Sequence, residues 1–239
     1  MTSFAWFVVA ALLLVLFAVW QRQRRLQREV YIRQFELPRG LFDKLRQRRP
    51  GLSLKDCQLT AHALRQFFLA YLKSGRGFVA MPSQVADDLW HEFILYTRNY
   101  DTFCRRAFGG FLHHTPAVVL GSAAKSNAGL RRVWWFTCRD ENIDPRKPTR
   151  LPLLFALDGK LGVADGFRYV PDCKGVRREG DTSGGAVYCG GDFGSGGVDG
   201  STDGFGDGHS GSSTSSSDGD AGGSSGDGGS GCGGGGCSS

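Results

Sequence analysis

The sequence lacks the short motifs by which most enzyme classes are recognised. It has no glycine-rich phosphate-binding loop and no element that would form an oxyanion hole. None of its seven cysteines forms a CxxC pair, and their spacings differ from the dense frameworks of small secreted domains. We therefore predict no catalytic residues, and we interpret most of the cysteines as free thiols in a reducing compartment.

Basic residues are absent from the last quarter of the chain. From residue 180 to the end there are eight Asp and no Lys or Arg, whereas the rest carries all 29 basic residues and the other 15 acidic ones. Most of the 36 glycines also lie in this last part. Such a composition has too little apolar surface to offset the entropy of folding, so 180–239 is predicted to be a disordered Gly/Ser/Asp-rich tail. Its Cys232 and Cys237 are either a soft-metal or disulfide pair or, as the simpler interpretation, two exposed thiols without a defined role.

Charge, Gly and Pro are also absent from Phe4 to Trp20, a run of 17 apolar residues. This length is at the short end of what spans a bilayer, and Trp6 and Trp20 lie near its ends, where aromatic rings favour the headgroup interface. A signal peptide would carry basic residues before the run, and Met-Thr-Ser has none. We therefore predict a single transmembrane helix over 4–20.

The segment 21–50 that follows is strongly basic. Between Gln21 and Arg49 there are ten Lys or Arg and three acidic residues. Such a block resists translocation, so we expect a single-pass protein of the cell inner (plasma) membrane with its C-terminal body in the cytoplasm. The block is also expected to attract anionic lipid headgroups. Nucleic-acid binding is an unlikely function for it, because no DNA- or RNA-binding module accompanies the charge.

The segment 51–173 reads as the folded body. Apolar residues recur at helical spacing in several stretches, and Ser83 is a plausible N-cap for one of them. Asp158-Gly159 lies between two apolar runs and indicates a tight hairpin, with 167–170 as an additional strand. The predicted fold class is therefore mainly α: a transmembrane helix, a helical bundle with a small β-hairpin, and a disordered tail. The expected helices of the body cover 52–73, 83–94, 99–108 and 127–139.

One candidate site stands out in this body. Asp87 and Asp88 precede His91 by four and three residues, so either carboxylate can meet the imidazole on one helix face. Carboxylates beside histidines commonly support metal sites, and imidazole and thiolate ligands together suit zinc. We therefore predict a metal site, with zinc as the expected ion, whose ligands are His91, Cys104, His113 and His114. The ordinary alternative is an Asp–His hydrogen bond near the surface and a packed core thiol.

The same segment carries a family resemblance. Ala86-Asp87-Asp88-Leu89-Trp90-His91-Glu92-Phe93, followed by Tyr100, Cys104 and His113-His114, resembles the glycine-rich domain-containing protein-like family, an uncharacterised group. The resemblance covers about Leu52 to Cys173, and the Gly-rich tail resembles those of bacterial membrane-anchored members. It implies a shared His/Cys site. Members typically have a second histidine where this chain has Phe93, so an inherited site is either rebuilt around Asp87, Asp88 and the downstream histidines, or lost.

Two classes of function remain open from the sequence. The first is a membrane-tethered binding or scaffolding protein, for which the flexible acidic tail indicates a protein partner. The alternative is an enzyme of unknown reaction, either metal-dependent or using Cys104 as nucleophile and His91 as base. Since no reaction class is recognisable, the first is the preferred hypothesis.

Overall fold

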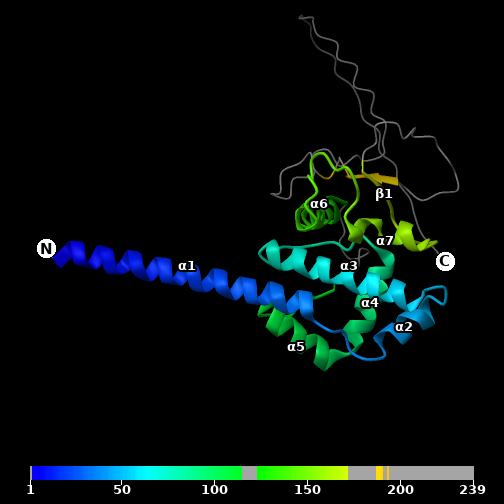
Figure 1. Ribbon diagram of the computed structural model, residues 1–239, viewed down its shortest axis with the longest axis horizontal. Helices are drawn as coiled ribbons and strands as arrows, with labels where there is room; N and C mark the ends of the chain where they lie inside the picture. The colour runs from blue at the N-terminus through cyan, green and yellow to red at the C-terminus, as the bar shows by residue number, and fades with distance from the viewer. Residues whose placement is uncertain (1, 115–122, 172–186, 191–192, 194–239) are drawn as a thin grey trace, which may run out of the picture. The chain divides into compact units, whose positions relative to one another are not determined.

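A computed structural model gives the fold of the chain (Figure 1). It describes residues 2–114, 123–171, 187–190 and 193. Over these residues the chain forms seven α-helices and one pair of short strands, which confirms the predicted mainly α class. Apart from 187–190 and 193, the predicted tail, including Cys232 and Cys237, lies outside the described residues.

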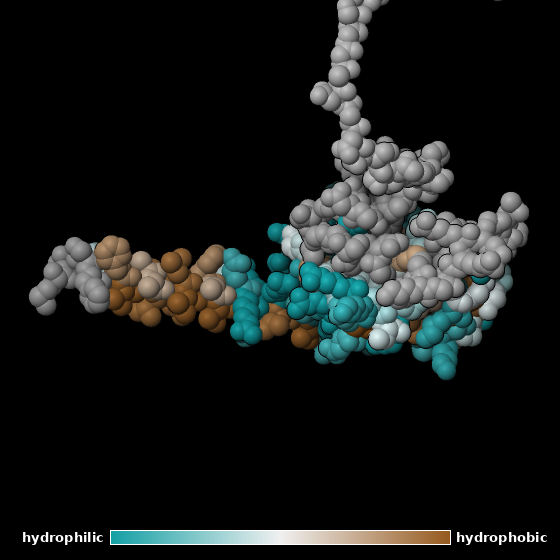
Figure 2. Space-filling view, turned by 90° about the horizontal axis from the view of Figure 1, so that it is seen from above, coloured by the Kyte–Doolittle hydropathy of each residue, from teal (hydrophilic) through white to brown (hydrophobic). Residues whose placement is uncertain are grey.

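The first helix, α1, runs from Thr2 to Gln34 and is therefore much longer than the predicted span. Residues 6–27 are exposed all round, and Figure 2 shows hydrophobic residues over most of this length, followed by a hydrophilic band. Within the described residues, one helix, Trp6–Gln34, is long and apolar enough to cross a membrane. None of its apolar window is buried, although a signal sequence would have the same length and composition.

The C-terminal part of α1 packs against the body, although it lies in the basic segment 21–50. Ile32 is fully buried, and the Arg28 guanidinium donates a hydrogen bond to the Phe108 carbonyl oxygen at 3.3 Å. The next helix, α2 (Leu41–Arg48), also lies in the basic segment and buries Leu41 and Leu45. Charge dominates this segment, so its few core residues give only a weak sequence signal.

A charged cluster attaches α1 to the rest of the body. The Asp140 carboxylate forms ion pairs with Arg33 of α1 and with Lys73, whose Nζ lies 2.7 Å from Asp140 Oδ1. Burial alone would raise the pKa of Asp140, but the two cations hold it below its usual value. The carboxylate therefore stays ionised and connects three helices.

Helices α3 to α5 form the part of the body that positions the candidate site. Helix α3 (Leu54–Lys73) begins at a capping box in which Ser53 and Asp56 bond each other's backbone N–H groups. Helix α4 (Gln84–Leu95) begins at Ser83, whose hydroxyl accepts a hydrogen bond from the Ala86 N–H, as predicted. Helix α5 (Thr97–Phe108) ends at Gly109 with φ of 76°, a left-handed conformation that favours glycine.

Residues 153–161 form a helix, so the predicted hairpin at Asp158-Gly159 is wrong. Helix α6 (Ala123–Asp140) covers the expected fourth helix, and α7 (Leu153–Leu161) begins after Pro152 and ends at Gly162. Leu154, Leu157 and Asp158 recur at helical spacing and are all buried. Tertiary burial of this face therefore outweighs the turn preference of the Asp-Gly dipeptide.

The two strands pair in parallel rather than as a hairpin. Strand β1 (Arg168–Val170) pairs with β2 (Val187–Cys189), with Tyr169 opposite Tyr188. Strand β2 lies within the range predicted as tail. So does Phe193, which is 3% exposed and packs against Trp134 and Phe155 of the body.

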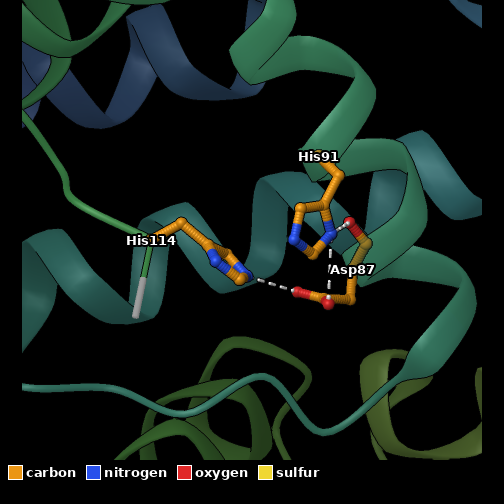
Figure 3. A group of neighbouring side chains, drawn as sticks. All are labelled: Asp87, His91 and His114. Carbon is orange, nitrogen blue, oxygen red and sulfur yellow. Dashed lines mark hydrogen bonds and ion pairs between the residues drawn. The ribbon is translucent and has the colours of Figure 1, made fainter. Parts of the chain in front are cut away.

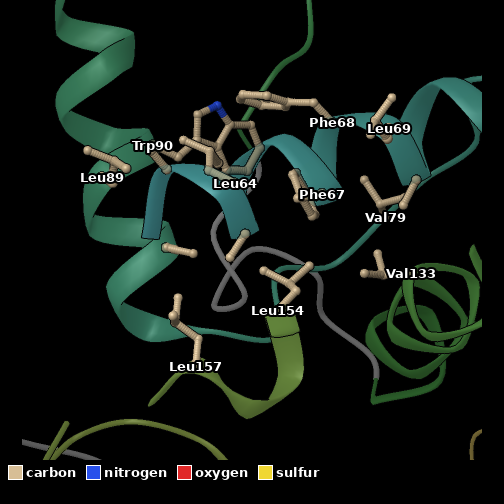
Figure 4. Packing of buried hydrophobic residues seen from close by; sticks show 14 of the residues in the cluster. Leu64, Phe67, Phe68, Leu69, Val79, Leu89, Trp90, Val133, Leu154 and Leu157 are labelled. Atoms are coloured by element: carbon tan, nitrogen blue, oxygen red, sulfur yellow. The ribbon is translucent and has the colours of Figure 1, made fainter. Parts of the chain in front are cut away.

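Aromatic rings pack together in the core between α3, α4 and α5, and Figure 4 shows Phe67, Phe68 and Trp90 among aliphatic side chains. The Phe67 ring lies 5.0 Å from Trp90, and the Phe68 ring lies 4.9 Å from Phe103, centroid to centroid. Leu154 and Leu157 of α7 extend this core on the other side of α3. The helix that carries the candidate site is thus packed on an apolar face.

A buried carboxylate holds the beginning of α4. Asp158 of α7 is 2% exposed. Its Oδ1 accepts hydrogen bonds from the Ser83 hydroxyl at 2.7 Å and the Val85 N–H at 3.2 Å. Its Oδ2 accepts from the Gln84 N–H at 2.7 Å and the Phe167 N–H at 2.9 Å. An anion at a helix N-terminus satisfies N–H groups that lack partners within the helix and also interacts favourably with the helix dipole.

Candidate metal centre

Helix α4 presents Asp87 and His91 on one face. The two residues are four apart, and His91 Nδ1 lies 3.3 Å from Asp87 Oδ2. The same nitrogen lies 3.0 Å from the Asp87 backbone oxygen. The predicted meeting of a carboxylate with His91 is therefore present, and Asp87 is the carboxylate that supplies it.

Asp88 is directed elsewhere. The residue is 6% exposed, and its carboxylate accepts hydrogen bonds from Arg48 at 3.3 Å and Arg49 at 2.8 Å. Arg49 also pairs with Asp165, so the group joins α2, α4 and the segment before β1. Asp88 therefore serves the packing of α4 and does not contact His91.

His114 approaches the same carboxylate from the segment after α5. His114 Nε2 lies 2.9 Å from Asp87 Oδ1, and its ring meets the Trp90 ring edge-on at a centroid distance of 4.6 Å. A buried hydrogen-bond chain fixes this segment: the Trp90 Nε1–H donates to the Tyr100 hydroxyl at 3.1 Å, and that hydroxyl donates to the Leu112 carbonyl at 2.6 Å. The backbone is thus held two residues before His114.

Together these three residues form a compact group, which we call the Asp–His–His triad (Figure 3). One ligand atom from each of Asp87, His91 and His114 lies within 4.8 Å of the other two. With Zn–N bonds of about 2.0–2.1 Å, two ligands of a tetrahedral zinc are about 3.3 Å apart. His114 Nε2 and His91 Nδ1 lie 2.9 and 3.3 Å from the Asp87 carboxylate, near that value, and each distance is to a different oxygen of the carboxylate.

The triad has one buried side and one open side. The His114 side chain is 13% exposed and that of Asp87 is 21% exposed, whereas that of His91 is 43% exposed. A metal bound by the three would therefore keep a position for water or another ligand on the side of His91.

Two residues of the predicted metal site lie outside the triad. Cys104 is fully buried on α5, and burial raises the pKa of its thiol. His113 is exposed, and its ring stacks on Phe111 at a centroid distance of 4.9 Å. The structure thus groups His91 and His114, adds Asp87, and places Cys104 and His113 apart from them.

Phe93, the residue at the position where the resemblance led us to expect a histidine, does not face the triad. It is fully buried, and its ring lies 5.2 Å from Tyr100 and 5.5 Å from Phe103. Positions 91 and 93 point in different directions because successive helical residues are rotated by about 100°. Phe93 therefore belongs to the aromatic core and not to the triad.

The three free cysteines of the described residues lack the environment of a reactive thiol. Cys57, Cys104 and Cys138 are free and buried, and burial raises the pKa of Cys138 to about 12. A nucleophilic cysteine needs a lowered pKa and access to substrate. Cys189 is disulfide-bonded, which differs from the free thiols expected for most cysteines.

Two cavities of the described residues lie away from the triad. A cavity of about 470 Å³ lies between α7 and β1, lined by residues that include Phe155, Val163 and Tyr169. Another of about 460 Å³ adjoins α2 and α3, near Phe42 and Arg65. Neither lining includes a triad residue.

Comparison with known proteins gives a family and no function. The model of the UCP032817-like family, an uncharacterised family, matches residues 27–193. No curated protein and no solved structure matches the chain. The matched range begins within α1 and ends at Phe193, in agreement with the core positions of Ile32 and Phe193. The protein belongs to the UCP032817-like family.

Proposed function

We propose that this protein is a membrane-anchored binding protein whose helical body holds a divalent transition metal at Asp87, His91 and His114. The observation that carries the proposal is the convergence of two imidazoles and one carboxylate within 4.8 Å. Imidazole nitrogens together with a carboxylate oxygen suit zinc, and they also suit ferrous iron with open positions. The indole ring of Trp90 beside His114 supports the proposal further, because a packed imidazole is pre-oriented as a ligand.

Substitutions at the neighbouring residues His113 and His114 test the metal site directly. The full-length protein, purified in detergent and supplied with zinc, is expected to retain about one zinc per chain. His114→Ala should lose it, because removal of a ligand should exceed the roughly 10–100-fold loss of affinity caused by second-shell changes. His113→Ala is the matched control and should retain the zinc, since His113 is exposed and outside the triad.

Zinc content measured by mass spectrometry after gel filtration separates the outcomes. Equal zinc in both variants, or no zinc in the parent protein at micromolar concentrations of free metal, would contradict the proposal. Thermal unfolding of the two variants without metal provides the folding control.

The open side of the triad favours a second candidate function, a metal-dependent enzyme. A metal with three protein ligands and one water is the usual arrangement of catalytic zinc, which lowers the pKa of that water. Hydrolysis of a test ester or phosphoester that requires zinc, and that His114→Ala abolishes while His113→Ala does not, would support this function. The cysteine-dependent alternative has less support because Cys104 is buried with a raised pKa.

The proposed location is the inner (plasma) membrane, with the body in the cytoplasm. The support is the excess of ten basic over three acidic residues between Gln21 and Arg49. The disulfide of Cys189 favours the opposite, oxidising side. We give the charge bias more weight because it acts on membrane insertion itself. Activity of an alkaline phosphatase fused to the C-terminus would overturn this topology.

We expect few arginines of α1 to take part in the proposed contact with anionic lipid headgroups. Arg25, Arg28 and Arg33 donate hydrogen bonds to the body, whereas Arg22 and Arg24 are exposed directly after the apolar run. Such cations contribute about 1 kcal/mol each at an anionic surface. The binding of a protein partner, and the relation to glycine-rich, membrane-anchored proteins, belong to the same proposal and rest on the sequence alone.

A further inference from the structure

After the apolar run that ends at Trp20, the two opposite faces of α1 have different environments. One face contacts the body: Arg25 donates to the Lys73 carbonyl at 3.0 Å, Arg28 donates to the Phe108 carbonyl, and Ile32 is fully buried. On the opposite face, Leu26 and Val30 remain 50% and 51% exposed. Two large apolar residues one turn apart are therefore left in solvent on a helix that is otherwise rich in arginine.

These two residues continue a regular stripe that begins in the apolar run. Positions separated alternately by three and four residues carry apolar side chains with one exception, Gln23, and the apolar ones are 47–63% exposed. This alternation is the heptad repeat, with a period of 3.5 residues, by which helices form left-handed coiled coils. We call it the α1 stripe; its members are Val9, Leu12, Leu16, Val19, Gln23, Leu26 and Val30.

The distribution of charge marks the same stripe. From Gln23 to Val30 no member of the stripe is charged, although this part of α1 is rich in arginine. The next position of the alternation is Arg33, which pairs with Asp140 of the body, so the stripe ends there. An arginine-rich helix with one charge-free face indicates that this face is covered by protein rather than by water or phosphate groups.

We propose that the α1 stripe is the interface of a parallel homodimer, in which α1 of one chain packs against α1 of a second copy. A heptad stripe is self-complementary about a two-fold axis, so an identical helix in register fits it directly. Chains inserted with the same orientation present their stripes in parallel. Each body contacts mainly the opposite face of its own α1 and reaches the side of the stripe at Arg33, beyond its last member, so both bodies lie outside the helix pair.

Gln23 gives this pairing its register. It occupies the core position between Val19 and Leu26, immediately after the apolar run. Polar residues at single core positions of coiled coils align the two helices because each amide finds its partner only in one register. Within lipid, close packing and hydrogen bonds drive helix association, while burial of Leu26 and Val30 adds a hydrophobic contribution outside it.

The test uses the full-length protein in mild detergent at micromolar concentration, with its mass measured by light scattering. The parent protein is expected to show twice the 25.9 kDa of one chain. The double variant Leu26→Lys, Val30→Lys should show the mass of one chain, because charges would enter the interface. Gln21→Lys adds a charge to an exposed position off the stripe and should leave the mass unchanged.

Cross-linking tests the same surface without destabilising it. Gln23→Cys should form a disulfide between two chains under mild oxidation, well above the parent background, whereas Gln21→Cys should not. A one-chain mass for the parent would overturn the homodimer and leave a different helix as the partner. A two-chain mass that the double variant retains, or equal cross-linking at positions 21 and 23, would place the contact elsewhere and also overturn the proposal.

Discussion

Replacing Asp158 by Asn is expected to lower the free energy of unfolding by roughly 2–4 kcal/mol, because buried donors that lose their acceptor cost about 1–3 kcal/mol each. The carboxylate accepts four hydrogen bonds, from the Ser83 hydroxyl and the N–H groups of Gln84, Val85 and Phe167. Asn is similar in size, but its amide nitrogen would face two of these donors. The lost charge also removes a favourable interaction with the N-terminus of α4.

Thermal unfolding followed by circular dichroism measures this effect. In a chain of this size each kcal/mol shifts the midpoint by about 2–4 °C, so a drop on the order of 10 °C is expected. Asp165→Asn is the control: the Asp165 side chain is 58% exposed and pairs with Arg49, which is worth about 1 kcal/mol or less. Equal shifts in the two variants would show that Asp158 does not hold α4.

Replacing Tyr100 by Phe is expected to destabilise the body by about 2–4 kcal/mol and to weaken metal binding. The hydroxyl accepts from Trp90 and donates to Leu112, and both groups are buried. Each buried group left without a partner costs about 1–3 kcal/mol. Burial also raises the pKa of Tyr100, so its hydroxyl remains a donor to the Leu112 carbonyl at every practical pH.

The metal readout separates positioning from general stability. Leu112 precedes His114 by two residues and Trp90 touches its ring, so the loss of the hydroxyl loosens one ligand in particular. Tyr71→Phe is the control, since Tyr71 packs through its ring on Phe108, 4.9 Å away. We expect zinc affinity to fall in Tyr100→Phe and to stay at the parent value in Tyr71→Phe. Unchanged affinity in both would remove Tyr100 from the positioning of the site.

Local signals in the sequence predict most of the helical body correctly. Ser83 marks the beginning of α4, and Gly109 marks the end of α5. The same kind of local reasoning fails at Asp158-Gly159, where the carboxylate is required by the N-terminus of a helix about 75 residues earlier in the chain. That requirement becomes visible only when α4 and α7 are placed side by side.

The candidate site, too, was predictable from the sequence only in part. The spacing of Asp87 and His91 is a property of one helix, so their contact was predictable. The burial of Cys104 was also within reach, because Tyr100, Cys104 and Ala107 share one face of α5, all fully buried. The choice between His113 and His114 depends on the path of the backbone after Gly109, which the Tyr100–Leu112 hydrogen bond sets.

In a membrane-anchored protein, the unbroken course of α1 would also set the distance between the body and the bilayer. Ile32, fully buried in the body, comes 12 residues after Trp20, a distance of about 18 Å along the axis at 1.5 Å per residue. A bilayer around residues 4–20 would hold the triad in a thin layer parallel to the surface, without a hinge in α1 to tilt it. Its encounters would then be two-dimensional: molecules in or on the same membrane would meet it repeatedly, whereas a soluble molecule would have to enter that layer first.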